Sequence, residues 1–196
     1  MEHLIKHYAL EAGALEIQYI EEFFGEFGRK KAATEIVERL ADREHLIHII
    51  EAPLPDDPGQ ISPVAFKVGH EIRDGETIPK LADLVRRLDG AVNFNDRKVL
   101  YAWIGGTRRD WRGQGFFRAL SEEQEAWALA NGFHEIVVKT KNRFYEMRGT
   151  LDNLEFQVVK YERHPRDNGE SKVYLSKKLD ASVLKSHRLS RTVVQA

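Results

Sequence analysis

Apolar positions in the first third of the chain recur first with strand spacing and then with helix spacing. Residues 3–10 alternate loosely between apolar and polar side chains, which predicts a strand, and residues 14–27 repeat at three- and four-residue intervals, which predicts an amphipathic helix. Residues 31–44 predict a second helix with Ile36 and Leu40 on its apolar face. Residues 45–52 and 63–72 predict two strands, joined by a loop because residues 53–59 are rich in proline.

A further amphipathic segment lies before the next predicted strand. Residues 73–98 are longer than a tight hairpin requires, and they contain a helix that Thr77 can cap, with Pro79 in its first turn and Asp89-Gly90 at its end. The apolar stripe of this helix consists of Ile78, Leu81, Leu84, Val85 and Leu88. Because an isolated helix of this length is marginal in water, the stripe must pack on its own domain or on a second subunit.

The middle of the sequence, residues 99–124, predicts a strand, a glycine-containing loop and a helix. The strand residues run into Gly105-Gly106, where adjacent glycines indicate a bulge or a ligand lying against the backbone. Gly113 and Gly115 precede a helix that starts at Phe116. Glycine lets a ligand approach the backbone, and the first N–H groups of a helix have no partners within it. We therefore expect an anion at this loop, and a phosphate is the simplest candidate.

Three arginines add fixed positive charge to the same loop: Arg108, Arg109 and Arg112. The alternative is a tight strand-to-helix turn whose arginines are only solvated. The helix after the loop has an apolar face that we expect on the sheet, with Phe116, Leu120 and Trp127. Its acidic face, which we expect in solvent, contains Glu122, Glu123 and Glu125. The remaining predicted elements are a strand at residues 134–141, a helix opening at Asn142, and a hairpin of residues 156–164 and 172–179.

Composition narrows the class of protein. A chain of 196 residues with 42% hydrophobic residues is long enough for one domain with a proper core. A formal net charge of -1 lacks the basic excess of a nucleic-acid binder, so we expect no nucleic-acid partner. The absence of cysteine excludes disulfides and thiolate metal sites and suits a cytoplasmic location. Because no apolar run has membrane-spanning length, the sequence predicts a soluble protein with no membrane partner.

The glycine loop and the elements after it resemble a known family. Arg112-Gly113-Gln114-Gly115 followed by a helix is similar to the R-x-x-G-x-G/A signature of the GNAT superfamily of acetyl-CoA-dependent N-acetyltransferases. Asn142 after the next strand resembles the family's second motif, in which an asparagine contacts coenzyme A. The terminal hairpin resembles the family's last two strands. The likeness covers roughly residues 98–179.

The resemblance implies a fold and a domain plan. The expected fold is a mixed α/β domain with a mostly antiparallel sheet, splayed near Gly105-Gly106, and with helices on both faces. Residues 1–179 would form this single domain, with residues 73–98 as a helical insertion. Residues 180–196 form a C-terminal tail, which the sequence leaves open between a helix, an inter-subunit arm and disorder. Since the family often dimerises, we expect a possible homodimer in which the stripe of the insertion helix meets a second subunit.

The resemblance also implies transfer of an acetyl group from acetyl-CoA to an amine of a small molecule or a peptide, with no metal. The backbone near Thr107 would hold the pantetheine arm and the thioester, the N–H groups of residues 113–117 would hold the diphosphate, and Asn142 would contact the pantetheine. The residues expected to bind coenzyme A are Gly106, Thr107, Arg108, Arg112, Gly113, Gln114, Gly115, Phe116, Phe117 and Asn142.

Three features depart from the family's pattern. Phe117 stands where the signature prefers Gly or Ala, so its ring must point away from the cofactor. Glu155-Phe156 stands where Gly-Phe usually ends the second-motif helix. Residues 149–151 contain no tyrosine, although many relatives keep one there to protonate the leaving thiolate. These departures weaken the assignment of a catalytic acid more than they weaken the expectation that the cofactor binds.

Direct transfer needs a neutral amine, so a base must take the proton of the ammonium form. We predict Glu51 as this base, because a strand ending at Glu51 and parallel to one ending at Gly105 reaches the same edge of the sheet. Glu71 would lie away from that edge. Tyr145, in the first turn of the second-motif helix, is the predicted acid. The alternatives are a surface carboxylate at Glu51 and a bystander tyrosine at Tyr145.

Two other classes of function stay open. A coenzyme A-binding sensor or interaction module without catalysis is supported by the missing mid-helix tyrosine. A dinucleotide-dependent oxidoreductase starts from the same glycines, but the sequence lacks a third glycine at the right offset and a ribose-binding acid.

The acceptor site and a metal site have weaker sequence support. His45 and His48 would lie on opposite faces of an alternating strand, which argues against a metal. An acceptor pocket could use aromatic or acidic residues of the first helix, although core packing and solvation are the alternatives for them. These residues are Phe23, Phe24, Phe27, Glu21, Glu22 and Glu26.

Overall fold

The computed structural model describes residues 3–10, 17, 19–21, 31–187 and 191–195. Most of the first predicted helix, including Phe23, Phe24 and Phe27, lies outside the described residues. By contact, the chain divides into two compact units. Unit 1 contains Met1–His70, Ile104–Ser121 and Arg188–Ala196, and unit 2 contains Glu71–Trp103 and Glu122–His187.

The strands of unit 1 lie in the order β3-β2-β1-β8. These strands are β1 (His3–Tyr8), β2 (His45–Leu54), β3 (Asp57–Ile72, ending in unit 2) and β8 (Arg191–Gln195). β2 pairs antiparallel with β1 and β3, whereas β8 pairs parallel with β1. Residues from the C-terminal tail thus add a strand to the edge of this unit, which is none of the three alternatives that the sequence left open.

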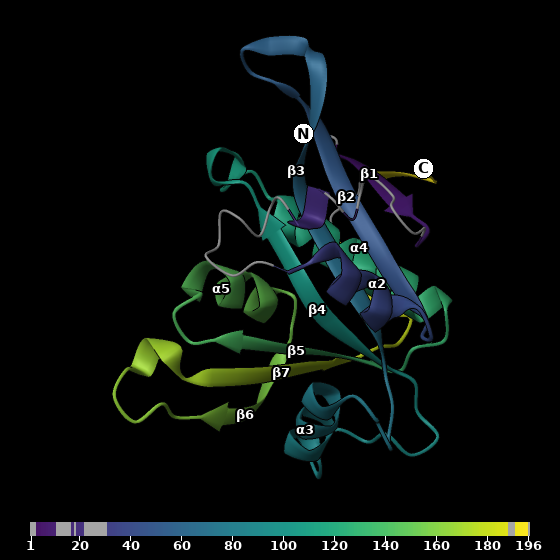
Figure 1. The fold of residues 1–196 in the computed structure, drawn as a ribbon, viewed down its shortest axis with the longest axis vertical. Helices are drawn as coiled ribbons and strands as arrows, with labels where there is room; N and C mark the ends of the chain where they lie inside the picture. The colour runs from purple at the N-terminus through teal and green to yellow at the C-terminus, as the bar shows by residue number, and fades with distance from the viewer. Residues whose placement is uncertain (1–2, 11–16, 18, 22–30, 188–190, 196) are drawn as a thin grey trace. The chain divides into compact units, whose positions relative to one another are not determined.

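The connection between β2 and β3 differs from the predicted loop at residues 53–59. Pairing continues through Pro53↔Ile61 to Leu54↔Asp57, so most of this segment is a hairpin that extends beyond the rest of the unit (Figure 1). A proline is tolerated in such a two-stranded ribbon where its missing N–H would face solvent instead of a neighbouring strand. The sequence prediction therefore ended β2 too early and began β3 too late.

Helices cover the strands of unit 1 on two sides. Figure 1 shows α2 (Ala33–Leu40) in front of these strands and the start of α4 (Phe116–Ala130) behind them. Ile36 and Leu40 of α2 are fully buried, as the helical spacing predicted. On the α4 side, the core cluster consists of Ile5, Ile50, Val64, Ala65, Phe116, Ala119 and Leu120.

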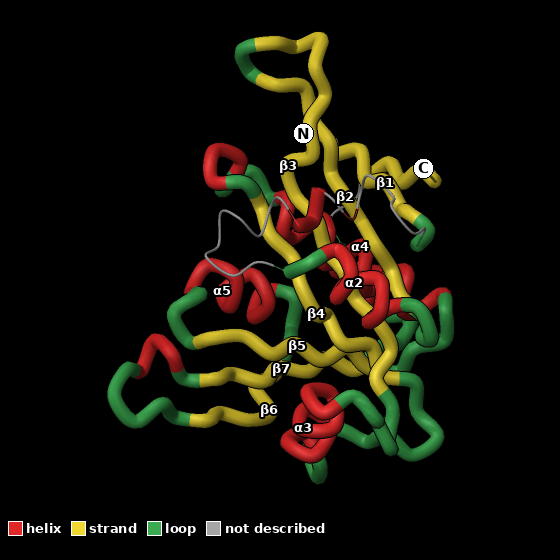
Figure 2. The backbone as a smooth tube through the Cα atoms, viewed as in Figure 1, coloured by secondary structure: helices red, strands yellow, loops and turns green. Residues whose placement is uncertain are grey.

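The strands of unit 2 lie in the order β6-β7-β5-β4 (Figure 2). They are β4 (Val99–Thr107, ending in unit 1), β5 (Glu135–Lys141), β6 (Gln157–Glu162) and β7 (Lys172–Lys178). β7 pairs antiparallel with β5 and β6, and the parallel ladder between β4 and β5 covers Val99–Tyr101 and Glu135–Val137. β4 continues to Thr107 beyond this short ladder, which agrees with a strand that separates from its neighbour.

The insertion helix α3 (Pro79–Leu88) packs on its own unit. Leu81, Leu84 and Leu88 are buried against a core that includes Tyr101, Val137 and Tyr174. The expectation that this stripe meets a second subunit is therefore wrong, because its leucines are already covered. The N-cap of the helix is Ile78, one residue after the predicted Thr77, with Pro79 at the first helical position.

The acidic run of α4 does not lie in solvent as predicted. Glu122 and Glu125 are buried. Glu125 accepts a hydrogen bond from Lys177 Nζ at 2.8 Å and lies 2.9 Å from His187 Nε2. These partners make burial of the carboxylate tolerable, and residues far along the chain supply them.

Unit 2 also carries helices on both sides of its strands. Tyr174 packs in the α3 cluster, while Lys177, three residues further along β7 and hence on the opposite face, binds α4. The second-motif helix is α5 (Tyr145–Asn153). The fold class is therefore the predicted one, a mixed α/β protein with mostly antiparallel strand pairs. No helix in the described part of the chain is long and apolar enough to cross a membrane.

Candidate functional site

The glycine loop of unit 1 connects the end of β4 to α4 through a short helical turn. After Thr107, the Arg108 N–H donates to the Val64 carbonyl at 2.9 Å, which ties the loop to β3. A 3₁₀ turn covers Arg109–Trp111. Gly113 and Gly115 then adopt φ values of 78° and 85°, in the left-handed region that residues with a Cβ rarely occupy. The backbone conformation therefore favours glycine at both positions.

The surface of this loop is open and carries unused hydrogen-bond donors. A Cβ built on Gly113 or Gly115 meets nothing within 4 Å. The N–H groups of Gly113, Gln114 and Gly115 have no partner among the described residues. These donors adjoin the N-terminus of α4, where the helix dipole favours negative charge. The loop thus presents backbone donors that could hold an anionic group.

The arginines of the loop are held in different ways. Arg108 Nη1 donates to Ser62 Oγ at 3.2 Å, and Arg112 Nε donates to the Thr107 carbonyl at 3.3 Å. Arg109 is exposed at the start of the 3₁₀ turn. The Arg108 side chain is therefore held on β3, and the Arg112 side chain is held on the backbone at the end of β4. Both add positive charge to this part of unit 1.

Gly105 and Gly106 have a partly structural role. A Cβ on Gly105 would lie 3.1 Å from the Phe66 carbonyl oxygen, closer than most real Cβ contacts. The neighbouring strand β3 also carries an irregularity here, since its register with β2 shifts between Ile50 and Glu51. The close approach of β3 and β4 within unit 1 therefore accounts for one of the two adjacent glycines.

The first residues of α4 anchor the loop in the core of unit 1. Phe116 is buried, and its ring centre lies 6.1 Å from that of Trp111. The Phe117 ring faces Lys67, whose Nζ lies 4.9 Å from the ring centre. Lys67 is itself buried on β3 and donates to Ser121 Oγ at 2.6 Å. Phe117 thus points toward a buried lysine, and this orientation agrees with the requirement that its ring avoid the ligand.

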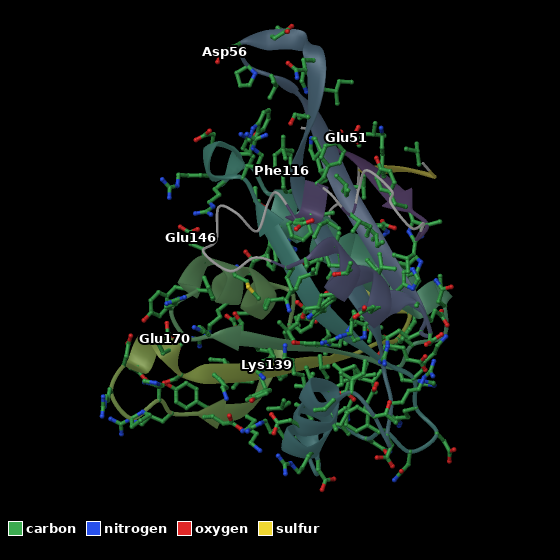
Figure 3. The ribbon with its side chains drawn as sticks, in the orientation of Figure 1. Glu51, Asp56, Phe116, Lys139, Glu146 and Glu170 are labelled. Carbon is green, nitrogen blue, oxygen red and sulfur yellow. The ribbon has the colours of Figure 1, made fainter. Side chains whose placement is uncertain are left out.

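Glu51 does not end its strand, because β2 continues to Leu54 (Figure 3). Its carboxylate has a partner on each oxygen. Tyr8 Oη donates to Oε1 at 2.8 Å, and Lys6 Nζ lies 2.6 Å from Oε2. Both partners come from β1, so Glu51 is held by two side chains of the neighbouring strand.

In unit 2, Asn142 follows β5 directly and is buried. Its N–H donates to the Ser171 carbonyl at 2.8 Å, and its side-chain oxygen accepts a hydrogen bond from Arg148. Tyr145 begins α5 and is 65% exposed. Unit 1 thus holds Glu51 and the predicted cofactor residues from Gly106 to Phe117, and unit 2 holds Asn142 and Tyr145.

Solved structures share this arrangement of elements over nearly the whole chain. The chain is similar to NAA60 from Arabidopsis thaliana in complex with a bisubstrate analogue, with a TM-score of 0.65, 10% identity, and coverage of 90% of this chain and 98% of that one. It is also similar to the acetyltransferase yncA from Salmonella typhimurium with acetyl-CoA, with a TM-score of 0.59, 11% identity, and coverage of 90% and 95%. A protein described as an acetyltransferase of the GNAT family from Desulfovibrio desulfuricans matches with a TM-score of 0.60, 10% identity, and coverage of 90% and 99%. No protein-family model and no curated protein matches the sequence.

The chain has the GNAT fold. The resemblance drawn from the glycine loop and the second motif is thus confirmed at the level of the fold. Within the signature, Gly113 and Gly115 have positive φ, and the N–H groups of residues 113–115 have no partner among the described residues.

Several polar residues with defined contacts were missed by sequence reasoning. Lys67 is a lysine within an apolar strand, a local signal that a buried charge lies on β3. Arg148 and Glu170 gave no such signal, because their partners are set by tertiary structure. Glu170 forms ion pairs with both Lys141 and Arg143 (Figure 3).

The histidines of the GNAT sheet have a packing role. His48 is fully buried and its Nε2 lies 2.9 Å from His7 Nδ1 on the neighbouring strand. Burial, helped by nearby His7 and Lys67, lowers the pKa of His48 to about 3. His48 is therefore neutral at physiological pH. Within the described residues, no group of three or more His, Cys, Asp or Glu side chains could hold a metal ion.

Proposed function

We propose that this protein is an acetyl-CoA-dependent N-acetyltransferase that acts on an amine of a small molecule or a peptide. The observation that supports it most is the set of consecutive N–H groups at Gly113, Gln114 and Gly115, which lack partners among the described residues and adjoin the start of α4. A strand-to-helix turn with a purely structural role would not need to present three backbone donors on an open surface.

The loop residues account for the recognition of an anionic cosubstrate. The donors of residues 113–117 would hold the diphosphate of coenzyme A, with Arg108 and Arg112 adding charge. The backbone at Gly106 and Thr107 would accompany the pantetheine arm, and Asn142 would contact this arm as well. When bound, acetyl-CoA supplies the activated acetyl group as a thioester.

The proposed proton transfers use Glu51 and Tyr145. Glu51 would accept the proton of the acceptor ammonium, which requires one oxygen to release Lys6 or Tyr8 first. Tyr145 would protonate the thiolate, and its exposed hydroxyl has no hydrogen-bond partner among the described residues. These roles predict that Glu51→Gln and Tyr145→Phe lower kcat with little change in coenzyme A binding.

The relatives in fold support an amine acceptor without specifying it. The NAA60 structure contains a bisubstrate analogue, and the yncA structure contains acetyl-CoA. We extend the acetyl-CoA chemistry to this chain because the signature loop has the required open donors. A cytoplasmic location and a homodimer remain predictions from the sequence and its resemblance.

The test separates binding from turnover. Titration calorimetry with coenzyme A and with acetyl-CoA measures binding, and release of free thiol from acetyl-CoA with a mixed panel of primary amines measures transfer. We expect micromolar-range binding and amine-dependent thiol release. Absence of any heat of binding, together with an unchanged melting temperature at saturating ligand, would reject the proposal.

A second candidate is a coenzyme A-binding sensor that does not catalyse transfer. The ion pair and hydrogen bond that occupy both oxygens of Glu51 favour it, as does the absence of a tyrosine at residues 149–151. Binding of coenzyme A without thiol release for any amine class in the panel would support this candidate over the enzyme.

A further inference from the structure

The contact between Arg148 and Asn142 shows which end of the Asn142 side chain is available to a ligand. Arg148 Nη1 donates to Asn142 Oδ1, and it also lies 3.5 Å from the Asn142 backbone carbonyl oxygen. A guanidinium has only donors, so the atom of the carboxamide that faces it must be the oxygen. The orientation of this amide is therefore determined by the chemistry of its partner.

The other end of the carboxamide is unused. Among the described residues, nothing accepts a hydrogen bond from Asn142 Nδ2. Asn142 as a residue is only 8% exposed, but Nδ2 is not one of the described buried side-chain atoms that lack a partner, so this nitrogen is accessible. The side chain thus presents one NH₂ donor that only a ligand or water can satisfy.

Among the described residues, the Arg148 guanidinium makes no ion pair and no hydrogen bond except with Asn142. No described carboxylate forms an ion pair with it, and its Nε is buried without a partner. A half-buried guanidinium that lacks a counter-ion and binds one amide oxygen is poorly explained as a stabilising ion pair. Its charge polarises the amide and so strengthens the opposite NH₂ as a donor.

The backbone around Asn142 is fixed independently of Arg148. The N–H groups of Asn142 and Arg143 donate to the carbonyls of Ser171 and Gly169, at 2.8 and 2.9 Å. Glu170 pairs with Lys141 and Arg143, the residues on either side of Asn142. Loss of Arg148 would therefore release the side-chain amide while the loop keeps its place.

We propose that Arg148 is a positioning residue, which holds the Asn142 carboxamide so that its NH₂ group donates to an acceptor oxygen of coenzyme A. The inference rests on the proposed function, and it assigns to Asn142 a donor role only. Arg148 itself does not touch the ligand.

Titration calorimetry with coenzyme A tests the proposal. Arg148→Met should weaken binding about tenfold, the scale of one charge-assisted hydrogen bond, whereas Arg148→Lys, which keeps a cationic donor, should stay within about threefold of wild type. Asn142→Ala should weaken binding similarly, and adding Arg148→Met to it should have little further effect, because the arginine then has nothing to position. In turnover, Arg148→Met should raise the KM for acetyl-CoA and leave kcat within about twofold.

Asn142→Asp tests the same contact by changing the amide instead of the arginine. An aspartate keeps an oxygen for Arg148 and loses the NH₂ donor, so the variant should remain folded by circular dichroism and bind coenzyme A at least about tenfold more weakly. Arg143→Met is the matched control, because it makes the same change in net charge close by in the chain, just before α5, and no hydrogen bond joins Arg143 to the amide. It should stay within about threefold of wild type, since an exposed ion pair contributes little.

The outcomes separate this inference from the proposed function. Wild-type protein that does not bind coenzyme A rejects the proposed function. Wild-type binding that Arg148→Met or Asn142→Asp leaves unchanged overturns the positioning role alone. Additive losses in the double variant, or equal losses in Arg143→Met, overturn it as well, because either result assigns the effect to charge and not to the amide. If Arg148→Met does not fold, the coenzyme A affinities of Asn142→Asp and of the control Arg143→Met still test the positioning role.

Discussion

Lys177 Nζ on β7 lies 2.8 Å from Glu125 Oε2 on α4, and the two side chains are 5% and 0% exposed. The same carboxylate oxygen lies 2.9 Å from His187 Nε2, while Oε1 is buried without a partner among the described residues. One buried carboxylate thus joins a helix, a strand and the segment after β7. A charge this deeply buried is stable only while its partners remain.

We predict that Glu125→Leu destabilises the protein by about 3–5 kcal/mol, because it leaves the Lys177 ammonium buried without a carboxylate. The double variant Glu125→Leu/Lys177→Met removes both charges and should recover a large part of that loss. Urea unfolding measures both free energies. As a matched control, Glu146→Leu changes an exposed glutamate and should alter stability by less than about 0.5 kcal/mol. A single variant as stable as wild type would contradict the role of the pair.

A second prediction concerns acid. The folded-state pKa of His48 is about 3, below its ordinary value of 6.5, because burial disfavours the charged ring. Above pH 6.5 both states are neutral at this position, and it contributes no pH dependence. As the pH falls below 6.5, the unfolded state binds a proton that the folded state does not, so stability decreases by about 1.4 kcal/mol for each pH unit until the folded-state pKa is reached.

The measurement is urea unfolding at several pH values between 7.5 and 4 for wild type and His48→Gln. The free energy of unfolding should fall more steeply with decreasing pH in wild type than in the variant. The difference corresponds to the uptake of up to about one proton on unfolding. Equal slopes for wild type and His48→Gln would show that His48 is protonated in the folded protein.

The insertion helix gives a third prediction. Leu81 is 1% exposed and packs in the core cluster of unit 2, so Leu81→Ala should cost about 2–5 kcal/mol through lost burial and a residual cavity. Lys80 is exposed on the same helix, and Lys80→Ala is the matched control with an expected change of less than about 0.5 kcal/mol. Light scattering with in-line chromatography should show the same oligomeric state for Leu81→Ala as for wild type. A change of oligomeric state would instead support a subunit interface at the apolar stripe of α3, which the packing of this helix within unit 2 argues against.

Features set by neighbouring residues were predicted well from the sequence. The glycine loop follows from local conformational preference, and Gly113 and Gly115 indeed adopt positive φ. The α3 stripe shows the limit of such reasoning: a periodic pattern says that Leu81 is buried but not which surface covers it. Burial of Glu125 could not be predicted because its partners lie 52 and 62 residues away. The amide orientation of Asn142 likewise depends on Arg148 in three dimensions.

The last prediction separates backbone strain from ligand binding at the glycine loop. Gly115 (φ 85°) and Gly132 (φ 74°) both require the left-handed region, and a Cβ at either position meets no other atom within 4 Å. Gly115→Ala and Gly132→Ala should therefore destabilise the protein similarly, by about 1–2 kcal/mol, since steric crowding contributes at neither site. Only Gly115 belongs to the loop with unused N–H donors.

Gly115→Ala should weaken coenzyme A binding at least about tenfold, because relaxation of the strained backbone turns the donors of the loop away from a common ligand. Gly132→Ala, at the end of α4, should bind with wild-type affinity at equal stability. Calorimetric titration measures the affinity for coenzyme A, and thermal unfolding of the same samples measures the stability. Equal affinities of the two variants for coenzyme A would place the phosphate away from the loop. The effect of Gly115→Ala would then be only the loss of stability through backbone strain that Gly132→Ala also shows.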